Sequence, residues 1–200
     1  MYNALTNKPL HKSITKANVI VNTKEQLKEL KNDNRIAVYQ IIDSDFKEFF
    51  CNNVYLSSLN LDDKIIDSVI NHVLGNKANI IIDTARTLDE VGFFDVKKNA
   101  SPIMYAEKLG LLQNSLIAGG VYLDKDDVDL MVQQNASLIL APSYDAGHAN
   151  GIPPYKLYKD RGLVMHFGTM DNSYNKTGCI NYEKDVLQLL VNGTMREQIL

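Results

Sequence analysis

Short apolar runs alternate with longer amphipathic stretches along this chain of 200 residues, and that alternation is the strongest constraint on its fold. There are seven such apolar runs. Several are rich in β-branched residues, and turn residues bound most of them, which predicts strands. They lack a strict alternation of apolar and polar residues, as is typical of strands buried on both faces of a parallel sheet. The predicted strands cover residues 17–21, 36–42, 49–56, 79–83, 115–123, 136–141 and 163–169.

The amphipathic stretches predict helices between the strands. In residues 61–74 the apolar side chains fall on one helical face, and Gly75 is expected to end the helix. Ser101 and Pro102 are the residue types of a helix cap and of a first helical position. The predicted helices cover residues 24–31, 61–74, the segment that opens at Ser101, 124–133, 153–160 and 182–191, with Gly193 as the last stop.

Repeated strand-then-helix units imply an α/β protein with a parallel sheet and right-handed crossovers. Seven strands are compatible with an open doubly wound sheet or with a shortened (β/α) barrel, and periodicity alone leaves that choice open. The connection at residues 43–47, between the second and third strands, is too short for a crossover helix. We expect one domain over residues 1–200, in which residues 1–16 form a polar leader.

The composition excludes several classes of function. A net charge of −3 and an isoelectric point near 5.8 give no attraction to phosphate, so nucleic acid is not an expected partner. Only Cys51 and Cys179 occur, and neither belongs to a CxxC motif, which indicates the reduced cysteines of a cytosolic protein. No apolar run approaches the roughly 18 residues of a membrane span, and the start has no signal-peptide pattern. We therefore expect a soluble, cytoplasmic protein that does not bind membranes.

The second half of the chain resembles a known family in the order of its motifs. The segment "SPIMYAEKLGLL" precedes a strand and then "VYLDKDDVDLM"; another strand leads to "NGIPPYKLYKDRG" and to a strand that ends in Gly168-Thr169. This order is similar to that of the amidohydrolase superfamily, in particular its deaminase and chlorohydrolase branch. The resemblance implies a shortened (β/α) TIM-type barrel of about seven parallel strands, without the family's first strand and its flanking β-sandwich.

The positions that carry the chemistry of this family hold other residues here. Its members hydrolyse their substrates with zinc or a similar ion, which histidines and an aspartate hold at strand ends. Asp83 and Arg86 stand where the fifth strand would bring a metal histidine and an acid/base glutamate. Gly119 stands in place of the histidine of the sixth strand, and Met170 in place of the aspartate of the closing Gly-Thr-Asp. No His-x-His pair occurs in the sequence. The resemblance therefore implies a degenerate site with no catalytic residue and no metal ligand at these positions.

Elementary chemistry gives the same expectation. Hydrolysis at a bound metal needs about three protein ligands and a base near the attacking water. Glycine supplies no ligand, methionine suits a borderline ion poorly, and the fixed charge of Arg86 would repel a divalent cation. We expect Asp83 and Arg86 to form a salt bridge in the emptied metal position, which would accept a small carboxylate or phosphate better than zinc. No cofactor is expected.

The leading hypothesis is a non-catalytic amidohydrolase-like domain that binds a small molecule or small anion, or that serves as a partner subunit. A homo-oligomer is expected, because a barrel without one strand leaves apolar interior uncovered. The candidate ligand-binding residues are Asp83, Arg86, Tyr144, Asp145, His148, His166 and Asp171. Tyr144, Tyr155, Tyr158 and Tyr174 are expected around the mouth of the barrel.

Two alternatives stay open. In the first, five of the candidates (Asp83, Asp145, His148, His166 and Asp171) or ligands from another chain rebuild a zinc site, and the protein is a deaminase-like hydrolase of carbon–nitrogen bonds. In the second, the chain is a relic without a selected biochemical role. Enzymatic activity is thus left open, with the inactive domain preferred.

Overall fold

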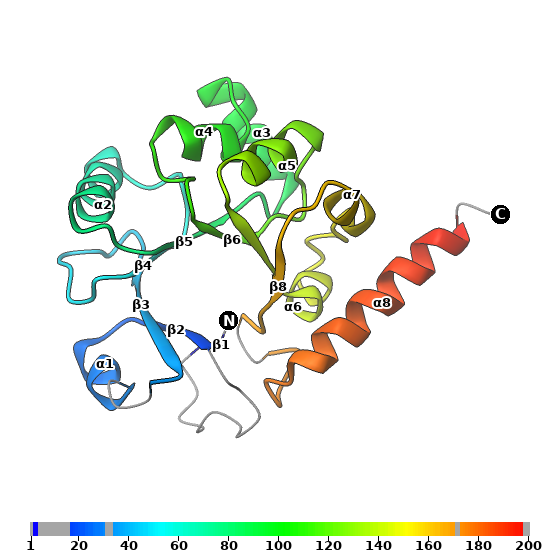
Figure 1. The fold of residues 1–200 in the computed structure, drawn as a ribbon, viewed down its shortest axis with the longest axis horizontal. Helices are drawn as coiled ribbons and strands as arrows, with labels where there is room; N and C mark the ends of the chain where they lie inside the picture. Colours follow the sequence, from blue (N-terminus) through cyan, green and yellow to red (C-terminus); the bar gives the residue numbers. More distant parts are fainter. Residues whose placement is uncertain (1, 4–16, 31–33, 171–172, 198–200) are drawn as a thin grey trace.

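The computed structural model describes residues 2–3, 17–30, 34–170 and 173–197. One sheet curls into an open barrel, and the helices lie outside it (Figure 1). The strands follow one another in sequence order across the sheet, and every pairing is parallel. They are β1 (Tyr2–Asn3), β2 (Ala17–Val21), β3 (Ile36–Ile42), β4 (Val54–Leu56), β5 (Ile80–Thr84), β6 (Leu116–Gly119), β7 (Ser137–Leu140) and β8 (Met165–Phe167).

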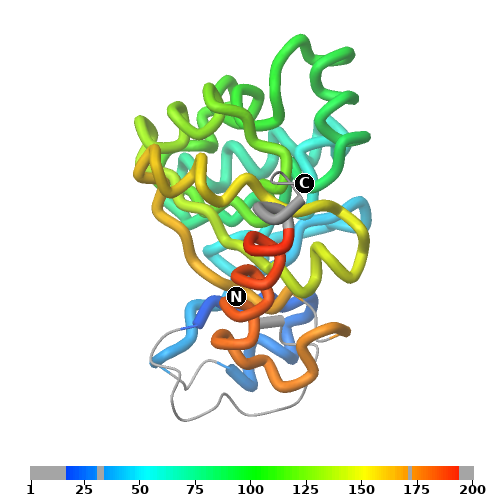
Figure 2. The backbone as a smooth tube through the Cα atoms, turned by 90° about the vertical axis from the view of Figure 1, so that its right-hand side faces the viewer, coloured from blue at the N-terminus to red at the C-terminus, as the bar shows by residue number. Residues whose placement is uncertain are grey.

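Several helices begin at polar caps. Asp62 accepts a hydrogen bond from the Lys64 amide, and Thr87 accepts one from the Glu90 amide. The helices are α1 (Lys24–Leu30), α2 (Asp63–Asn76), α3 (Leu88–Lys98), α4 (Pro102–Lys108), α5 (Lys125–Gln133), α6 (Pro142–Gly147), α7 (Tyr155–Asp160) and α8 (Ile180–Glu197). Figure 2 looks onto the side of the barrel that carries α8, drawn in orange and red. Within the described residues, no helix combines the length and the apolar character that crossing a membrane requires.

Buried side chains fall into two clusters, because successive residues of a strand point to opposite faces of the sheet. The inner cluster lies inside the curl and consists of Ile20, Tyr39, Tyr55, Ile81, Ala118, Ile139, Ala141 and Met170. The larger outer cluster joins the other face of the sheet to the helices, with residues such as Ile82 and Leu138 from strands and Val69, Phe94 and Val128 from helices. Polar residues that continue the inward-facing rows therefore meet at the carboxyl ends of the strands.

The predicted shortened TIM-type α/β fold is confirmed. Seven strands, β2 to β8, coincide with the seven predicted runs, and they form a curled, parallel sheet with helices between them. β1 was not predicted: Tyr2–Asn3, inside the expected polar leader, pairs with β2, while residues 4–16 lie outside the described part of the chain. β1 and β8 stand at the two ends of the strand order, so the described strands form an open sheet and not a closed ring.

Several predicted boundaries were wrong. The run at residues 49–56 gives only the three-residue β4, because the backbone before it hydrogen-bonds to the Gln40 side chain. Gly75 does not end α2, which runs to Asn76 and is capped by Lys77 in the left-handed conformation, with φ 50°. Gly193 lies inside α8.

Two helices were not predicted. α3 carries a weaker apolar pattern than α2, with Phe94 as its one buried residue. α6 has only six residues, which is too short for a periodic pattern to be read from the sequence.

Candidate functional site

A buried guanidinium stands at the carboxyl ends of β5, β6 and β7. Arg86 follows β5 after a turn in which Ala85 has a φ of 53°. Its Nε donates to Asp83 Oδ1 at 3.0 Å, and its Nη1 donates to Asp145 Oδ1 at 2.5 Å. Its Nη2 lies 3.7 Å from Met170 Sδ. One cation therefore joins a carboxylate of β5 to a carboxylate of α6.

Neighbouring polar and aromatic groups complete this network. The Tyr55 hydroxyl, from β4, donates to Asp83 Oδ2. Asn150 Nδ2 donates to Asp145 Oδ1 at 3.1 Å. The Tyr144 ring lies with its centroid 5.1 Å from Arg86 Cζ, within the range of a cation–π interaction. The guanidinium and both carboxylates are thus held from several directions. We call Tyr55, Asp83, Arg86, Asp145 and Asn150 the Arg86 network.

Gly119 provides the space that this network fills. Its φ is 97°, a conformation that residues with a Cβ rarely adopt. A Cβ at this position would lie 2.7 Å from the Thr84 carbonyl oxygen, 3.2 Å from Arg86 Cβ and 3.3 Å from Asp83 Oδ1. No side chain fits there while Arg86 and Asp83 keep their places. The glycine and the ion pair are therefore mutually dependent.

Glu90 holds the turn that carries Arg86. Its carboxylate accepts from the Arg86 amide at 3.1 Å and from the Thr84 hydroxyl at 2.6 Å. Burial raises the pKa of the Glu90 carboxyl, while the hydrogen bonds from Thr84 and Arg86 act in the opposite direction. The sequence signal was present, because Thr87 and Glu90 have the Thr-x-x-Glu spacing of a capping box.

Electrostatics favour a permanently charged Arg86. Burial by itself would lower its pKa, but Asp83 and Asp145 outweigh that effect and raise the pKa above its ordinary value. Burial also raises the pKa of the Asp145 carboxyl, with Arg86 acting against it. Burial, and then the nearby Asp83, raise the pKa of the Tyr55 hydroxyl well above its ordinary value, so Tyr55 stays a hydrogen-bond donor.

The structure brings together most of the residues that the resemblance places at the position of the family's metal centre. Asp83, Arg86, Gly119 and Met170 lie together at the strand ends, as predicted, and the expected Asp83–Arg86 salt bridge is present. Asp145 joins them as a second partner of Arg86, which was not predicted. Asp171 lies outside the described residues.

The two predicted histidines stand apart from the Arg86 network. His148 ends α6, is exposed, and packs its ring between Tyr144 and Tyr174, with centroid distances of 4.1 Å and 5.1 Å. His166 pairs with Ile139 across the sheet, so it shares the inward face with the inner cluster, and its side chain is exposed. His148 Nδ1 instead lies 3.0 Å from the Tyr144 carbonyl oxygen, within hydrogen-bonding distance.

Two of the four tyrosines expected at the mouth are elsewhere. Tyr158 is fully buried in the outer cluster, and its hydroxyl donates to the Gly120 carbonyl at 2.7 Å. Tyr155 packs against the same outer cluster. Both lie on α7, and the sequence predicted that helix without showing which face would meet the sheet.

The sequence did not reveal three residues of this site. Tyr55 and Asn150 belong to the Arg86 network, and Glu90 holds the turn that carries Arg86. Tyr55 pairs with Ile81 across the sheet, so it lies on the same face as Asp83, but that register needs the sheet to be known. Asn150 lies in the loop after α6 and reaches Asp145 only because that loop folds back.

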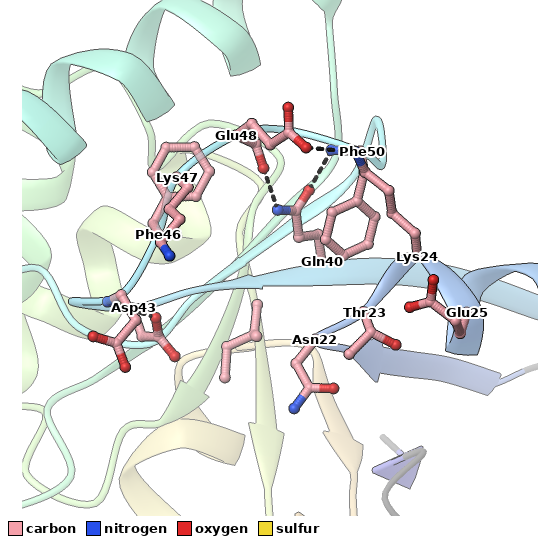
Figure 3. Close-up of a pocket in the computed structure, with 12 residues that line it drawn as sticks. Asn22, Thr23, Lys24, Glu25, Gln40, Asp43, Phe46, Lys47, Glu48 and Phe50 are labelled. Atoms are coloured by element: carbon pink, nitrogen blue, oxygen red, sulfur yellow. Dashed lines mark hydrogen bonds and ion pairs between the residues drawn. The ribbon is translucent and has the colours of Figure 1, made fainter.

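A second feature lies elsewhere on the same rim. A cavity of about 500 Å³ opens at the carboxyl ends of β2 and β3, with Asn22, Lys24, Gln40, Asp43, Phe46 and Glu48 among its lining residues (Figure 3). None of the predicted ligand-binding residues lines it. The site residues predicted from the sequence lie between positions 83 and 171, and no site was predicted at the ends of the second and third strands.

The residues of the Arg86 network do not fit a divalent metal ion. Asp83 and Asp145 both direct an oxygen at the guanidinium, and Arg86 would repel a second cation at that position. Across the described ranges, no group of three or more histidine, cysteine, aspartate or glutamate side chains has an arrangement that could hold a metal.

Curated relatives in sequence carry deaminase names. The 5-methylthioadenosine/S-adenosylhomocysteine deaminase of Caldicellulosiruptor saccharolyticus is 26% identical over 179 residues, which are 87% of this chain and 40% of the relative. The protein of the same name from Natronomonas pharaonis is 30% identical over 84 residues, 42% of this chain and 20% of the relative. The chain thus spans well under half the length of these relatives. No protein-family model matches it.

Solved structures with a similar fold include two deaminases. An adenosine deaminase from Xanthomonas campestris with bound zinc has a TM-score of 0.67 at 14% identity, covering 86% of this chain and 36% of that one. A guanine deaminase from C. acetobutylicum has a TM-score of 0.66 at 15% identity, covering 80% and 47%. These identities show the fold alone. Together, the relatives in sequence and the neighbours in fold support the resemblance to the deaminase-like branch of the amidohydrolase superfamily.

Proposed function

We propose that this chain is a non-catalytic amidohydrolase-like domain in which the Arg86 guanidinium takes the place of a metal ion. The observation that carries the proposal is the pairing of Arg86 with Asp83 and Asp145 at the carboxyl ends of the strands. Enzymes of this fold class place their chemistry at that end of the barrel. A metal-dependent site needs a position that a metal ion can occupy, and here the Arg86 side chain occupies that position.

Geometry supports an internal cation. The planar guanidinium presents its donors in a fixed fork, and two of them already bind carboxylates from different elements. Each charge is satisfied by the other, which lowers the free-energy cost of burying them. For the same reason, a small anion at Arg86 would have to displace Asp83 or Asp145, so we favour the internal cation over an anion receptor.

The role proposed for such a domain is binding, either of a small molecule or of a partner chain. Self-association is the partner role that we favour. The open sheet leaves the outer edges of β1 and β8 outside the described strand pairing, and α8 carries the exposed side chains of Tyr182 and Leu189. Light scattering at high micromolar concentration should give a dimer or larger; a stable monomer would remove this part of the proposal. We also propose a cytoplasmic location, supported by two cysteines that form no disulfide.

A second candidate function is metal-dependent deamination, which the names of the relatives favour. It would require metal ligands from another chain or from residues beyond the described ranges, because Asp83 and Asp145 bind Arg86. Under this alternative, substrates would resemble those in the relatives' names, that is, 5'-methylthioadenosine and S-adenosylhomocysteine.

Metal content and deamination distinguish the two functions. The protein is purified without chelator, its zinc and manganese are measured by mass spectrometry, and ammonia release from 5'-methylthioadenosine is followed with each metal added. We expect far less than one metal per chain and no ammonia. Stoichiometric metal together with metal-dependent ammonia release, which Asp160→Asn on an exposed ion pair leaves intact, would refute the proposal.

Chemical rescue tests the internal cation directly. Arg86→Gly should leave a cavity flanked by Asp83 and Asp145, and millimolar methylguanidinium should raise its melting temperature more than that of the original protein. Methylammonium, which lacks the planar fork, serves as the control cation. An equal response of both proteins to methylguanidinium would show that the two carboxylates do not need a cation there.

A further inference from the structure

The cavity at the ends of β2 and β3, which we call the β2–β3 pocket, has the size of a small-molecule site. Its volume of about 500 Å³ lies within the roughly 300–1,000 Å³ that is usual for such sites. It lies at the carboxyl ends of parallel strands, the end at which this fold class binds ligands. It is separate from the Arg86 network, since the two share no residue.

The wall of the pocket is held in place by Gln40. This side chain is 3% exposed; its Nε2 donates to the Glu48 carbonyl at 2.8 Å, and its Oε1 accepts from the Phe50 amide at 2.8 Å (Figure 3). On the other side of the same loop, the Phe49 ring stacks on His72 of α2, with a centroid distance of 3.9 Å. The loop at residues 43–50 is thus anchored to both β3 and α2, and the pocket does not depend on a ligand for its shape.

Two polar side chains face the barrel interior at this rim. Ile20 pairs with Tyr39 in the sheet, and both point inward; because side chains alternate, Asn22 and Asp43 continue the same inward rows. Figure 3 shows both of them on one side of β3, with Phe46 and Glu48 on the other. Asp43 Oδ1 accepts from the Asp45 amide at 3.0 Å, and its Oδ2 has no partner in the described part of the chain.

The charge of the lining selects the ligand class. Four carboxylates line the pocket, from Glu25, Asp43, Asp45 and Glu48, against two ammonium groups, from Lys24 and Lys47. The Lys24 ammonium is paired with Glu48 at 2.5 Å. A negative excess of this kind attracts cations and repels anions. The rings of Phe46 and Phe50 add apolar surface that can also lie against a cation.

We infer that the β2–β3 pocket binds a small organic cation, an amine with an apolar body, and that Asp43 is its counter-ion. This inference gives a site and a ligand class to the binding role proposed above. It concerns a part of the rim that the ion pair of Arg86 leaves open.

Three probes of one shape test the charge preference. Phenethylammonium, 2-phenylethanol and phenylacetate have similar size and differ in charge, and binding of each to the full chain is measured by calorimetry at low ionic strength. We expect the cation to bind at least about tenfold more tightly than the anion, with affinity falling as salt is added. Equal affinities for the cation and the neutral alcohol, or no binding of the cation up to about 10 mM, would overturn the inference.

Two variants test the location. Asp43→Asn should weaken phenethylammonium binding about three- to tenfold without altering the alcohol, as expected for loss of one partly exposed charge. Asp160→Asn, which removes a carboxylate of an exposed pair on α7, should change nothing. Unchanged binding by Asp43→Asn would place the cation elsewhere and overturn the assignment. Neither outcome depends on the metal and deamination tests of the Arg86 network, so the two proposals can fail separately.

Discussion

Two ion pairs at the same rim of the barrel have the same length and opposite surroundings. Arg86 Nη1 lies 2.5 Å from Asp145 Oδ1, and Lys24 Nζ lies 2.5 Å from Glu48 Oε1. The side chains of the first pair are 11% and 2% exposed, and those of the second are 55% and 68% exposed. Distance alone would treat the two pairs alike.

The two ion pairs differ in whether water can take the place of a charged partner. Around Arg86, the side chains are largely buried, and each charge depends on its protein partner because an unpaired buried charge is costly. Around Lys24, solvent can replace either partner, so the pair stays open to exchange with a ligand. One sector of the rim is therefore closed by the protein itself, while the other keeps a pocket. Three predictions test this contrast, and a fourth concerns a buried carboxyl group outside both regions.

The largest effect is expected from breaking the buried pair. Arg86→Ala leaves Asp83 and Asp145 buried without a cation, and it should lower the free energy of unfolding by about 3–5 kcal/mol. Chemical denaturation measures the change, with the double variant Arg86→Ala, Asp145→Ala as the comparison. The double variant should lose less than the sum of the two single variants, because no charge is then left without its partner at position 145. Strict additivity would contradict coupling of this pair.

The next effect concerns the space that Gly119 leaves for the network. Gly119→Ala would put a Cβ 2.7 Å from the Thr84 carbonyl oxygen, at a φ of 97°. We expect a loss of about 2–4 kcal/mol from the clash and the strained backbone. Gly193→Ala is the matched control, because nothing lies within 4 Å of its Cβ position and the residue is helical. That variant should be neutral or stabilising by up to about 1 kcal/mol. If both variants behave alike, Gly119 is not the site of close approach.

A moderate, pH-dependent effect is expected at Asp127, which lies outside both regions. Burial raises the pKa of this carboxyl from 3.8 to about 6, against the opposing hydrogen bond from Ser101. A folded-state pKa above the unfolded value means that the folded state holds the proton more tightly. Stability should therefore fall as the pH rises from about 4 to 6, by about 1–2 kcal/mol. Asp127→Asn should flatten this part of the profile in thermal melts, and an unchanged slope would contradict the assignment.

The smallest effect is expected from the exposed pair. Lys24→Ala should leave the melting temperature unchanged within error, because both partners are solvated. It should remove the lowered pKa of the Glu48 carboxyl, whose main cause is the hydrogen bond from Lys24. Titration of Glu48 by NMR measures this change. A melting temperature as strongly reduced as that of Arg86→Ala would remove the contrast between the two regions.

Local patterns in the sequence were sufficient for much of the fold. Seven strands follow from short apolar runs bounded by turn residues, and most helices follow from a period of 3.6 residues and from caps such as Ser101. All of these signals depend on residues close together in the chain. The pairing of Asp83 with Arg86 could be predicted for the same reason, because the two are three positions apart at a strand end.

Only the tertiary structure decided which distant groups meet. Asp145 is 59 positions from Arg86, and Tyr55 is 28 positions from Asp83; both contacts depend on the register and curl of the sheet, which no local period encodes. The same holds for the β2–β3 pocket, whose wall forms because Gln40 binds the backbone of a loop whose last residues, 49 and 50, were predicted to begin a strand. The sequence determined which residues stand at the strand ends, and the curvature of the sheet determined which of them are buried together and which remain open to a ligand.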